Sequence, residues 1–477
     1  MTDIYDVIVL GGGPVGENAA QYAVANSDRT AVIVEHELVG GECSYWACMP
    51  SKALLLPGSV LDQARNMPGV ASLVGDRTLD ADAVLARRDS YTHGLDDSSQ
   101  VEWAESAGID VVRGHGRLAG EKTVTVGDRT LTARHAVVLA TGTTAAVPPI
   151  PGLREARPWT SRDSTNLHEV PDRVLILGGG VVACESATWL LALGARVTMV
   201  VRSGLLGTAE PFAGTAVADA LTAAGADIRT GATIGRVDRP DARDTGYGRV
   251  HGGPATVTIE SDAGTETVEV DEILVAAGRR PATDDLGLDT VGLTPGESVP
   301  VDDALTAVGD WLYAAGDVNG RALLTHMGKY QARVCGDVIA ARADGRPTDS
   351  RRHRATADHG QVPQVVFTTP EVASVGPTEA AAREAGRDVR TVETDIAVAG
   401  SSLRQDNFSG HAKLVIDRAS DTLLGATFVG QGVAEILHSA TVAVVGTVAL
   451  DVLWHAVPSY PTTSEIWLRL LEEAREQ

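Results

Sequence analysis

The sequence predicts an α/β protein with two Rossmann-like dinucleotide-binding domains followed by a C-terminal α+β domain. A β-branched run, a glycine turn and a helical pattern occur in this order twice, with turns that start at Gly11 and Gly178. After residue 360, short strands and a hairpin precede helices. The chain has 477 residues, enough for about three domains at roughly 100–200 residues each.

Composition limits the function classes. Lys and Arg number 40 against 63 Asp and Glu, a net charge of −23, so nucleic acid is not expected as the main partner. A hydrophobic content of 44% excludes a mostly disordered chain. No stretch reaches the roughly 18 apolar residues of a membrane span, and the first residues are acidic where a signal peptide carries Lys or Arg. We expect a cytoplasmic protein without membrane contact.

The first glycine turn predicts a dinucleotide site. Gly11, Gly13 and Gly16 follow a strand expected at residues 6–10 and open a helix. Such a turn brings backbone N–H groups and the helix N-terminus to a pyrophosphate. Glu35 ends the next strand, where its carboxylate can accept hydrogen bonds from a ribose.

The second glycine turn predicts a nicotinamide nucleotide site. Gly178, Gly180 and Ala183 repeat the pattern, and the following strand ends at Val201 with Arg202 behind it. An acid at that place suits the ribose of NADH, whereas an Arg suits the 2′-phosphate of NADPH, so the sequence favours NADPH over NADH. A solvated surface cation is the alternative interpretation of Arg202.

Several segments connect these units. Strand-to-glycine exits are expected at residues 136–142, 273–281 and 312–320. A polar, unpatterned stretch at 346–360 is typical of a linker, and the Gly/Asp/Arg-rich residues 239–254 predict a surface loop.

Two of the four cysteines lie close together, because Cys43 and Cys48 are five residues apart. In a regular α-helix, Cα atoms at this spacing lie about 8.6 Å apart, whereas a disulfide tolerates no more than about 7 Å. A bridge therefore requires a distorted backbone. Redox chemistry, two buried free thiols and half of a metal site all remain open. Cys184 and Cys335 are expected to be core thiols.

In chain order these motifs resemble the flavoprotein disulfide reductases, the group of dihydrolipoamide dehydrogenase, glutathione reductase and mercuric reductase. The segment GGECSYWACMPSKALL is similar to the redox-disulfide segment of that family, and the resemblance covers essentially the whole chain. The further matching motifs are Ala140-Thr141-Gly142, the Gly178 turn with Glu185, Gly278-Arg279-Arg280-Pro281, Ala315-Gly316-Asp317 and the segment 366–376.

The resemblance implies FAD on the first turn and a pyridine nucleotide on the second. It implies that Lys52 lies by the flavin and pairs with Glu185, that Cys48 faces the flavin, and that Cys43 attacks the acceptor. The expected catalytic residues are Cys43, Cys48, Lys52, Glu185, Tyr460 and Glu465, with no metal site. The expected cofactor-binding residues are Gly11, Gly13, Gly16, Glu35, Thr141, Gly142, Gly178, Gly180, Ala183, Arg202, Gly278, Arg279, Gly316 and Asp317.

The chain departs from this family in its tail. Where the family carries His-Pro-Thr-x-x-Glu, the chain has Tyr460 through Glu465, with Tyr at the place of the acid/base His. A Tyr, with an ordinary pKa near ~10, donates a proton but is a poor base beside a His near ~6.5. Mercuric reductases resemble the chain here but carry a C-terminal Cys pair that this tail lacks, which disfavours mercuric ion. Tyr45 and Trp46 either pack in the core or form an aromatic wall of the disulfide pocket.

We therefore expect an FAD-dependent NAD(P)H oxidoreductase that passes electrons through a Cys43–Cys48 disulfide to a small disulfide or another electrophile. The alternatives are a quinone or dye reductase without dithiol turnover, and a dihydrolipoamide dehydrogenase. The resemblance also implies a homodimer whose tail completes the partner's site. The expected domains are 1–150 and 281–350 for FAD, 151–280 for NAD(P)H, and 361–477 for dimerisation.

Overall fold

The computed structural model describes residues 2–476 and divides into two compact units, each built from several chain segments. Unit 1 comprises Met1–Pro50, Asp89–Ala146 and Gly278–Asp358, and unit 2 comprises Ser51–Arg88, Val147–Ala277 and His359–Gln477. The domain boundaries that the sequence suggests remain a prediction.

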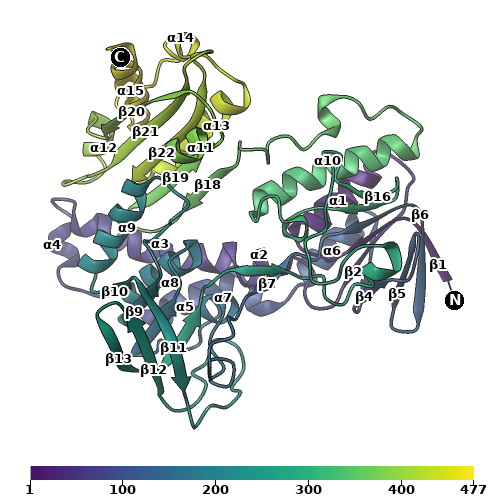
Figure 1. Cartoon of the computed structure of the whole chain (residues 1–477), viewed down its shortest axis with the longest axis horizontal. Coiled ribbons are helices and arrows are strands. Elements are labelled where there is room, and N and C mark those ends of the chain that lie inside the picture. Colours follow the sequence, from purple (N-terminus) through teal and green to yellow (C-terminus); the bar gives the residue numbers. More distant parts are fainter. Residues whose placement is uncertain (1, 477) are drawn as a thin grey trace. The chain divides into compact units, whose positions relative to one another are not determined.

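The core of unit 1 is a mixed sheet in the order β16-β17-β6-β1-β2-β3, with β5 and β4 added beside β6 (Figure 1). Strands β1, β2, β3, β6 and β17 pair in parallel, and Val7, Ile8 and Val9 of β1 have no exposed surface. Such an apolar run is typical of a strand covered on both faces. The strands are β1 (Thr2–Leu10), β2 (Ala31–Glu35), β3 (Ile109–Arg113), β4 (Gly116–Leu118), β5 (Thr123–Val126), β6 (Arg129–Leu139), β16 (Thr306–Val308) and β17 (Leu312–Ala314), and a separate pair joins β7 (Thr143–Ala145) to β15 (Arg279–Pro281).

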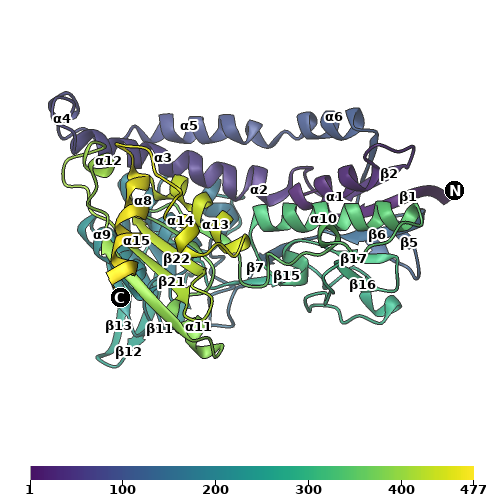
Figure 2. The ribbon, with the colours of Figure 1, turned by 90° about the horizontal axis from the view of Figure 1, so that it is seen from above.

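Two helices of unit 1, α1 (Pro14–Val24) and α10 (Thr325–Ala343), lie side by side in both views (Figures 1 and 2). Glycines on α10 permit the close approach. A Cβ atom added at Gly328 would lie 2.5 Å from Cγ2 of Val15, and one added at Gly336 would lie 2.5 Å from Cβ of Tyr22. The other α-helices that begin in unit 1 are α2 (Gly41–Tyr45), α3 (Cys48–Arg65), which continues into unit 2, and α6 (Ser98–Ser106). Helix α5 (Ala81–Tyr91) begins in unit 2 and ends in unit 1.

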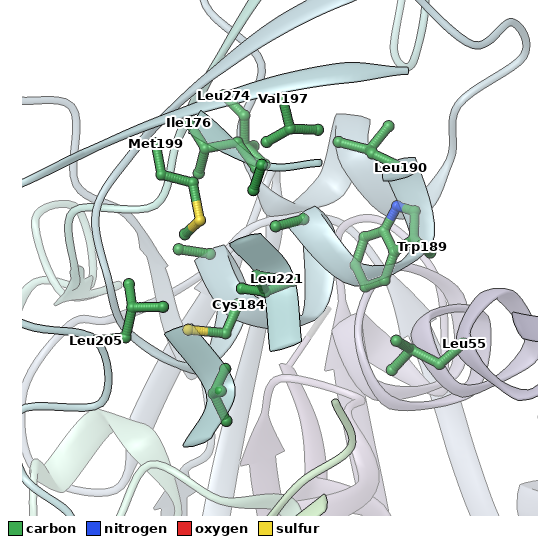
Figure 3. Close-up of a cluster of buried hydrophobic side chains, with 14 of the residues drawn as sticks. Leu55, Ile176, Cys184, Trp189, Leu190, Val197, Met199, Leu205, Leu221 and Leu274 are labelled. Atoms are coloured by element: carbon green, nitrogen blue, oxygen red, sulfur yellow. The ribbon is translucent and has the colours of Figure 1, made fainter. Parts of the chain in front are cut away.

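Unit 2 contains the second Rossmann-like sheet, parallel and in the order β10-β9-β8-β14. Leu55 of α3 shares one hydrophobic cluster with Cys184 and Trp189 of helix α8 (Figure 3). The elements of this region are β8 (Arg173–Leu177), β9 (Arg196–Val201), β10 (Asp227–Thr230), β14 (Glu272–Val275), the antiparallel strands β11 (Ala232–Asp238), β12 (Ala255–Ser261) and β13 (Gly264–Val270), and helices α4 (Ala71–Val74), α7 (Ser161–Thr165), α8 (Val181–Ala192) and α9 (Pro211–Ala223).

The C-terminal part of unit 2 is an antiparallel sheet in the order β18-β19-β22-β21-β20. Helices α13 and α15 lie against it in Figure 2, and Phe428 of β22 packs on Trp467 of α15. The elements are β18 (Pro363–Val366), β19 (Glu371–Val375), β20 (Val389–Asp395), β21 (His411–Asp417), β22 (Leu423–Gly430), α11 (Glu379–Glu384), α12 (Ala399–Ser402), α13 (Leu437–Val445), α14 (Leu450–Leu453) and α15 (Ile466–Glu476).

The expected surface loop at 239–254 has no helix or strand, but its description as a surface segment is wrong at three buried residues, Arg239, Gly248 and His251. Arg239 is buried and donates to both carboxylate oxygens of Glu272, at 2.8 and 3.1 Å. His251 is also buried, and its backbone N–H donates to Glu272 at 2.9 Å. A buried charge must be paired, so this ion pair draws both ends of the loop into the core.

Cys184 and Cys335 are buried core thiols, as expected. Burial raises the pKa of Cys184 to about 12 and that of Cys335 beyond its ordinary range, so both stay protonated at neutral pH. Within residues 2–476, no helix has both the length and the apolar character needed to cross a membrane.

The α1–α10 contact generates a stability prediction. Gly336→Ala gains up to about 1 kcal/mol of helix propensity, but the new methyl group meets Cβ of Tyr22 and lies 2.9 Å from the backbone nitrogen of Ala23. We expect a net loss of about 1–3 kcal/mol in the free energy of unfolding, measured by urea denaturation. The control is Arg333→Ala, an exposed position of the same helix, which should change stability by less than about 0.5 kcal/mol. Equal stability of the two variants would contradict the close packing.

Candidate active site

The glycine turn of unit 1 has the geometry of a dinucleotide loop. Gly11 has φ +102°, and a Cβ atom added there would collide with the backbone oxygen of Ala140. A Cβ atom added at Gly16 would collide with the backbone oxygen of Gly11, so the helix packs directly on the turn. Glu35, at the end of β2, accepts a hydrogen bond from the Gly12 N–H at 2.6 Å.

A polar network lies beside this turn. Arg279 donates to the Thr143 hydroxyl at 2.6 Å and to Glu42 at 2.6 Å, and the Thr143 hydroxyl donates to Asp317 at 2.9 Å. Burial raises the pKa of Asp317, against the opposing effect of the Thr143 hydrogen bond. Thr141 has a buried hydroxyl with no hydrogen-bond partner within residues 2–476.

These unit 1 residues fit a bound FAD. The turn offers the N-terminus of α1 to a pyrophosphate, and an added Cβ atom at Gly13 would meet only the Cα atom of Gly41, at 3.9 Å. The inaccessible Thr141 hydroxyl and the half-buried Asp317 carboxyl suit the hydroxyl groups of a ribityl chain. Gly142, Gly278 and Gly316 line the same region with positive φ values of 70°, 124° and 80°.

Cys43 and Cys48 lie on two different helical segments, because α2 ends at Tyr45 and α3 begins at Cys48. Trp46 caps α2 with φ −136° and ψ 2°, which is the backbone distortion that the spacing requires for a bridge. Neither cysteine is in a disulfide in this structure. The pKa of the Cys43 thiol is raised, mainly by its hydrogen bond with the Cys48 thiol and secondly by burial. The two sulfur atoms are therefore within reach of each other.

The Cys48 sulfur also contacts the hydroxyl of Thr325, the first residue of α10, at 3.2 Å. Tyr45 and Trp46, between the cysteines, are buried, with exposed fractions of 1% and 4%. Their rings meet edge to face at 5.8 Å, and the Tyr45 hydroxyl donates to the backbone oxygen of Val39. This confirms that both aromatic rings pack in the core.

Lys52 and Glu185 form the expected pair within unit 2. The Lys52 ammonium donates to both carboxylate oxygens of Glu185, at 2.8 and 3.1 Å, and lies 4.7 Å from the ring centre of Phe367. Glu185 also accepts the backbone N–H of Phe367 at 2.9 Å. Lys52 lies one turn before Leu55 on α3, and Glu185 one turn before Trp189 on α8, so the cluster of Figure 3 aligns the pair.

The second glycine turn repeats the geometry of the first. A Cβ atom added at Gly178 would collide with the backbone oxygen of Ala276, whereas Gly180 has open space beside it. Ala183 is buried at the start of α8. Arg202 follows β9, is exposed, and has no ion pair among the residues that the structure describes.

Tyr460 and Glu465 lie in the C-terminal part of unit 2. The Tyr460 side chain is 76% exposed. Glu465 ends the short helix η6 (Thr463–Glu465), and its Oε2 atom is buried with no hydrogen-bond partner among residues 2–476.

Four residues near the predicted site residues were not predicted from the sequence. Thr325 and Lys329 lie one turn apart on α10, Glu17 lies in the first turn of α1, and Phe367 contacts Lys52. The sequence signals are faint: Lys329 is one of only four lysines, and Phe367 lies within the segment 366–376.

Two protein-family models match most of the chain. Residues 5–342 match the model of the pyridine nucleotide-disulphide oxidoreductases, and residues 362–470 match the dimerisation domain of these enzymes. The mercuric reductase of Staphylococcus aureus is 30% identical over 97% of this chain and 81% of its own length. The dihydrolipoyl dehydrogenase of Chlamydia trachomatis is 30% identical over 98% of this chain and 96% of its own.

A solved structure has the same fold as this chain. The HOCl-induced flavoprotein disulfide reductase RclA from Escherichia coli superposes with a TM-score of 0.81 at 23% identity, over 98% of this chain and 99% of the other. The α/β architecture predicted from the sequence is therefore confirmed, and the dimerisation-domain match supports a homodimer. The chain is an oxidoreductase that belongs to the FAD-dependent pyridine nucleotide-disulphide oxidoreductase family.

Proposed function

We propose that this enzyme moves electrons from NADPH through FAD to the Cys43–Cys48 pair, and from there to a small disulfide or another electrophile. The observation that carries the proposal is the pair of adjacent thiols at the break between α2 and α3. A dithiol that can close to a disulfide stores one electron pair. Bound FAD supplies hydride acceptance from the nucleotide and electron transfer to the disulfide.

The cofactor sites follow from the two glycine turns. Gly11, Gly13 and Gly16 hold the FAD pyrophosphate, and Glu35 binds its ribose. Thr141, Gly142, Gly278, Arg279, Gly316 and Asp317 hold the rest of this cofactor, and Gly178, Gly180, Ala183 and Arg202 hold the nucleotide.

Lys52 and Glu185 form an ion pair in unit 2. The Glu185 carboxylate holds the ammonium in place through two hydrogen bonds, and the ring of Phe367 lies against it. A fixed positive charge favours the negative charge that develops when an electron pair arrives. We assign Lys52 this role and Glu185 the role of a positioning residue.

Cys43 attacks the acceptor, and Cys48 then closes the disulfide and releases the product. Tyr460 of the partner subunit donates a proton rather than accepting one, and Glu465 of the partner subunit positions it. A dihydrolipoamide dehydrogenase needs a base to oxidise a dithiol, so Tyr at this position argues against that activity. Direct reduction of a quinone or dye, with the cysteines structural, is the remaining alternative.

A reductive titration tests the dithiol directly. Anaerobic titration of the oxidised holoenzyme should consume four electrons per FAD, two for the flavin and two for the disulfide. Cys43→Ser should consume only two, because no disulfide can form, while pyridine nucleotide still reduces the flavin. The control Cys184→Ala removes a buried core thiol and should keep the count at four.

The same variants separate the alternatives in turnover. Cys43→Ser should lose at least about 10³-fold in disulfide reduction, as expected when a nucleophile is removed. If the wild-type enzyme reduces no disulfide and Cys43→Ser keeps full quinone reductase activity, the quinone alternative replaces the proposal.

The choice of nucleotide rests on Arg202. A charge-assisted hydrogen bond to the 2′-phosphate is worth about 1.5–3 kcal/mol, so Arg202→Ala should raise KM for NADPH by roughly 10–100-fold and leave KM for NADH unchanged. Arg196→Ala, at the exposed opposite end of β9, is the control and should change neither value. An equal KM for NADPH in wild type and Arg202→Ala would contradict the NADPH assignment.

A further inference from the structure

The carboxyl group of Asp317 lies in a tight turn of unit 1. The turn is the short helix η3 (Asp317–Asn319), and Gly316 before it has φ +80°. The backbone N–H of Asn319 donates to the Gly316 oxygen at 3.1 Å, and a Cβ atom added at Gly316 would lie 2.9 Å from Cγ2 of Val15. The position of the Asp317 carboxyl therefore depends on the groups that hold this turn.

One buried oxygen atom holds both ends of the turn. Gln331 lies on α10 and has no exposed surface. Its Oε1 atom accepts the backbone N–H of Gly316 at 2.7 Å and the side-chain amide of Asn319 at 2.8 Å. The Asn319 amide also donates to the backbone oxygen of Ala314, the last residue of β17, at 3.1 Å. Asp317 therefore lies between the two residues that Gln331 holds.

A buried carboxylate fixes the orientation of the Gln331 amide. The Nε2 atom of Gln331 donates to Asp358 at 2.8 Å, and the Asp358 side chain has no exposed surface. An ionised carboxylate only accepts hydrogen bonds, so Nε2 must face Asp358 and Oε1 must face the turn. A flipped amide would place its oxygen against the carboxylate and its N–H groups against the N–H of Gly316.

Arg321 pairs with the Asp358 carboxylate and attaches its segment to the turn. The guanidinium lies 3.2 Å from Asp358 and 3.2 Å from Asp303, and it donates to the backbone oxygen of Ala355 at 2.9 Å. Asp358 belongs to the polar stretch 346–360, whose sequence predicts a linker. A buried carboxylate must be paired, so the end of this stretch is held at the Asp317 turn.

We propose that Gln331 is a positioning residue of the FAD site and that Asp358 sets the orientation of its amide. The amide oxygen holds the turn in the conformation in which the Asp317 carboxyl meets the hydroxyl groups of the ribityl chain. This inference rests on the role that the proposed function gives to Asp317.

The test measures how fast the diluted holoenzyme releases FAD, from the rise in flavin fluorescence, between about pH 5.5 and about pH 9. Gln331→Met removes the acceptor oxygen and leaves the N–H groups of Gly316 and Asn319 without this partner. Release should therefore be at least about tenfold faster than in the wild type at every pH. Gln21→Glu, exposed on α1, is the control and should match the wild type.

Gln331→Glu separates amide orientation from packing, because it has nearly the same shape. Its carboxylate still accepts from the turn, but its second oxygen faces Asp358, and the two carboxylates share one proton at low pH. Release should match the wild type near about pH 5.5 and become at least about tenfold faster toward about pH 9, where the proton is lost and the charges repel.

A double variant tests whether Asp358 is the carboxylate that faces Gln331. Gln331→Glu combined with Asp358→Asn leaves one carboxylate at this contact, so no proton is shared. Its release rate relative to the wild type should not change with pH. If the double variant keeps the pH dependence of Gln331→Glu, or if Gln331→Glu has none, the orienting role of Asp358 is overturned.

Asp317→Asn distinguishes failure of this inference from failure of the proposed function, and it should also speed release at least about tenfold. Wild-type release from Asp317→Asn would overturn the cofactor role of Asp317. Fast release from Asp317→Asn with wild-type release from Gln331→Met would overturn the role of Gln331 alone. If urea denaturation shows that Gln331→Met does not fold, the pH series of Gln331→Glu decides.

Discussion

The contact between the backbones of Gly13 and Gly41 is the constraint on which the candidate site depends. Any side chain at Gly41 would collide with the phosphate-binding turn, and Gly40 and Gly41 adopt φ values of +107° and +55° that other residues rarely reach. The cysteine-bearing segment is therefore tied to the turn that fits FAD. Catalytic groups must be held to within about 0.5 Å of their productive geometry, and the close backbone contact leaves the cysteine-bearing segment little room to shift against this turn.

A second constraint acts within unit 2, where hydrophobic packing positions a charge. Leu55 and Trp189 meet in a buried cluster, and one turn earlier on each helix Lys52 meets Glu185. The Glu185 side chain is 6% exposed and its carboxylate accepts hydrogen bonds from the Lys52 ammonium and from the Phe367 backbone N–H, which fix its orientation. The core therefore holds this charge in place, as the role that we propose for Lys52 requires.

Much of the fold was predictable because short sequence segments determine its strands and turns. Strands β2, β8 and β9 have the bounds of their apolar runs, and the two glycine turns have the expected geometry. The two cysteines and the Lys52–Glu185 pair were predicted from the sequence motifs that resemble the family. The contact of Thr325 with Cys48 was not, because the two residues are 277 positions apart in the sequence. The burial of Arg239 was also not predicted, because its partner Glu272 lies 33 residues later, beyond the hairpin of β12 and β13.

The central claim, that Cys43 and Cys48 alternate between disulfide and dithiol at the expense of pyridine nucleotide, is tested most directly by mapping thiols. The oxidised holoenzyme is treated anaerobically with iodoacetamide, with and without NADPH, and its peptides are analysed by mass spectrometry. The account predicts a linked Cys43–Cys48 peptide without nucleotide, and label on Cys43 only after NADPH is added. Equal labelling of Cys43 in both samples would contradict it.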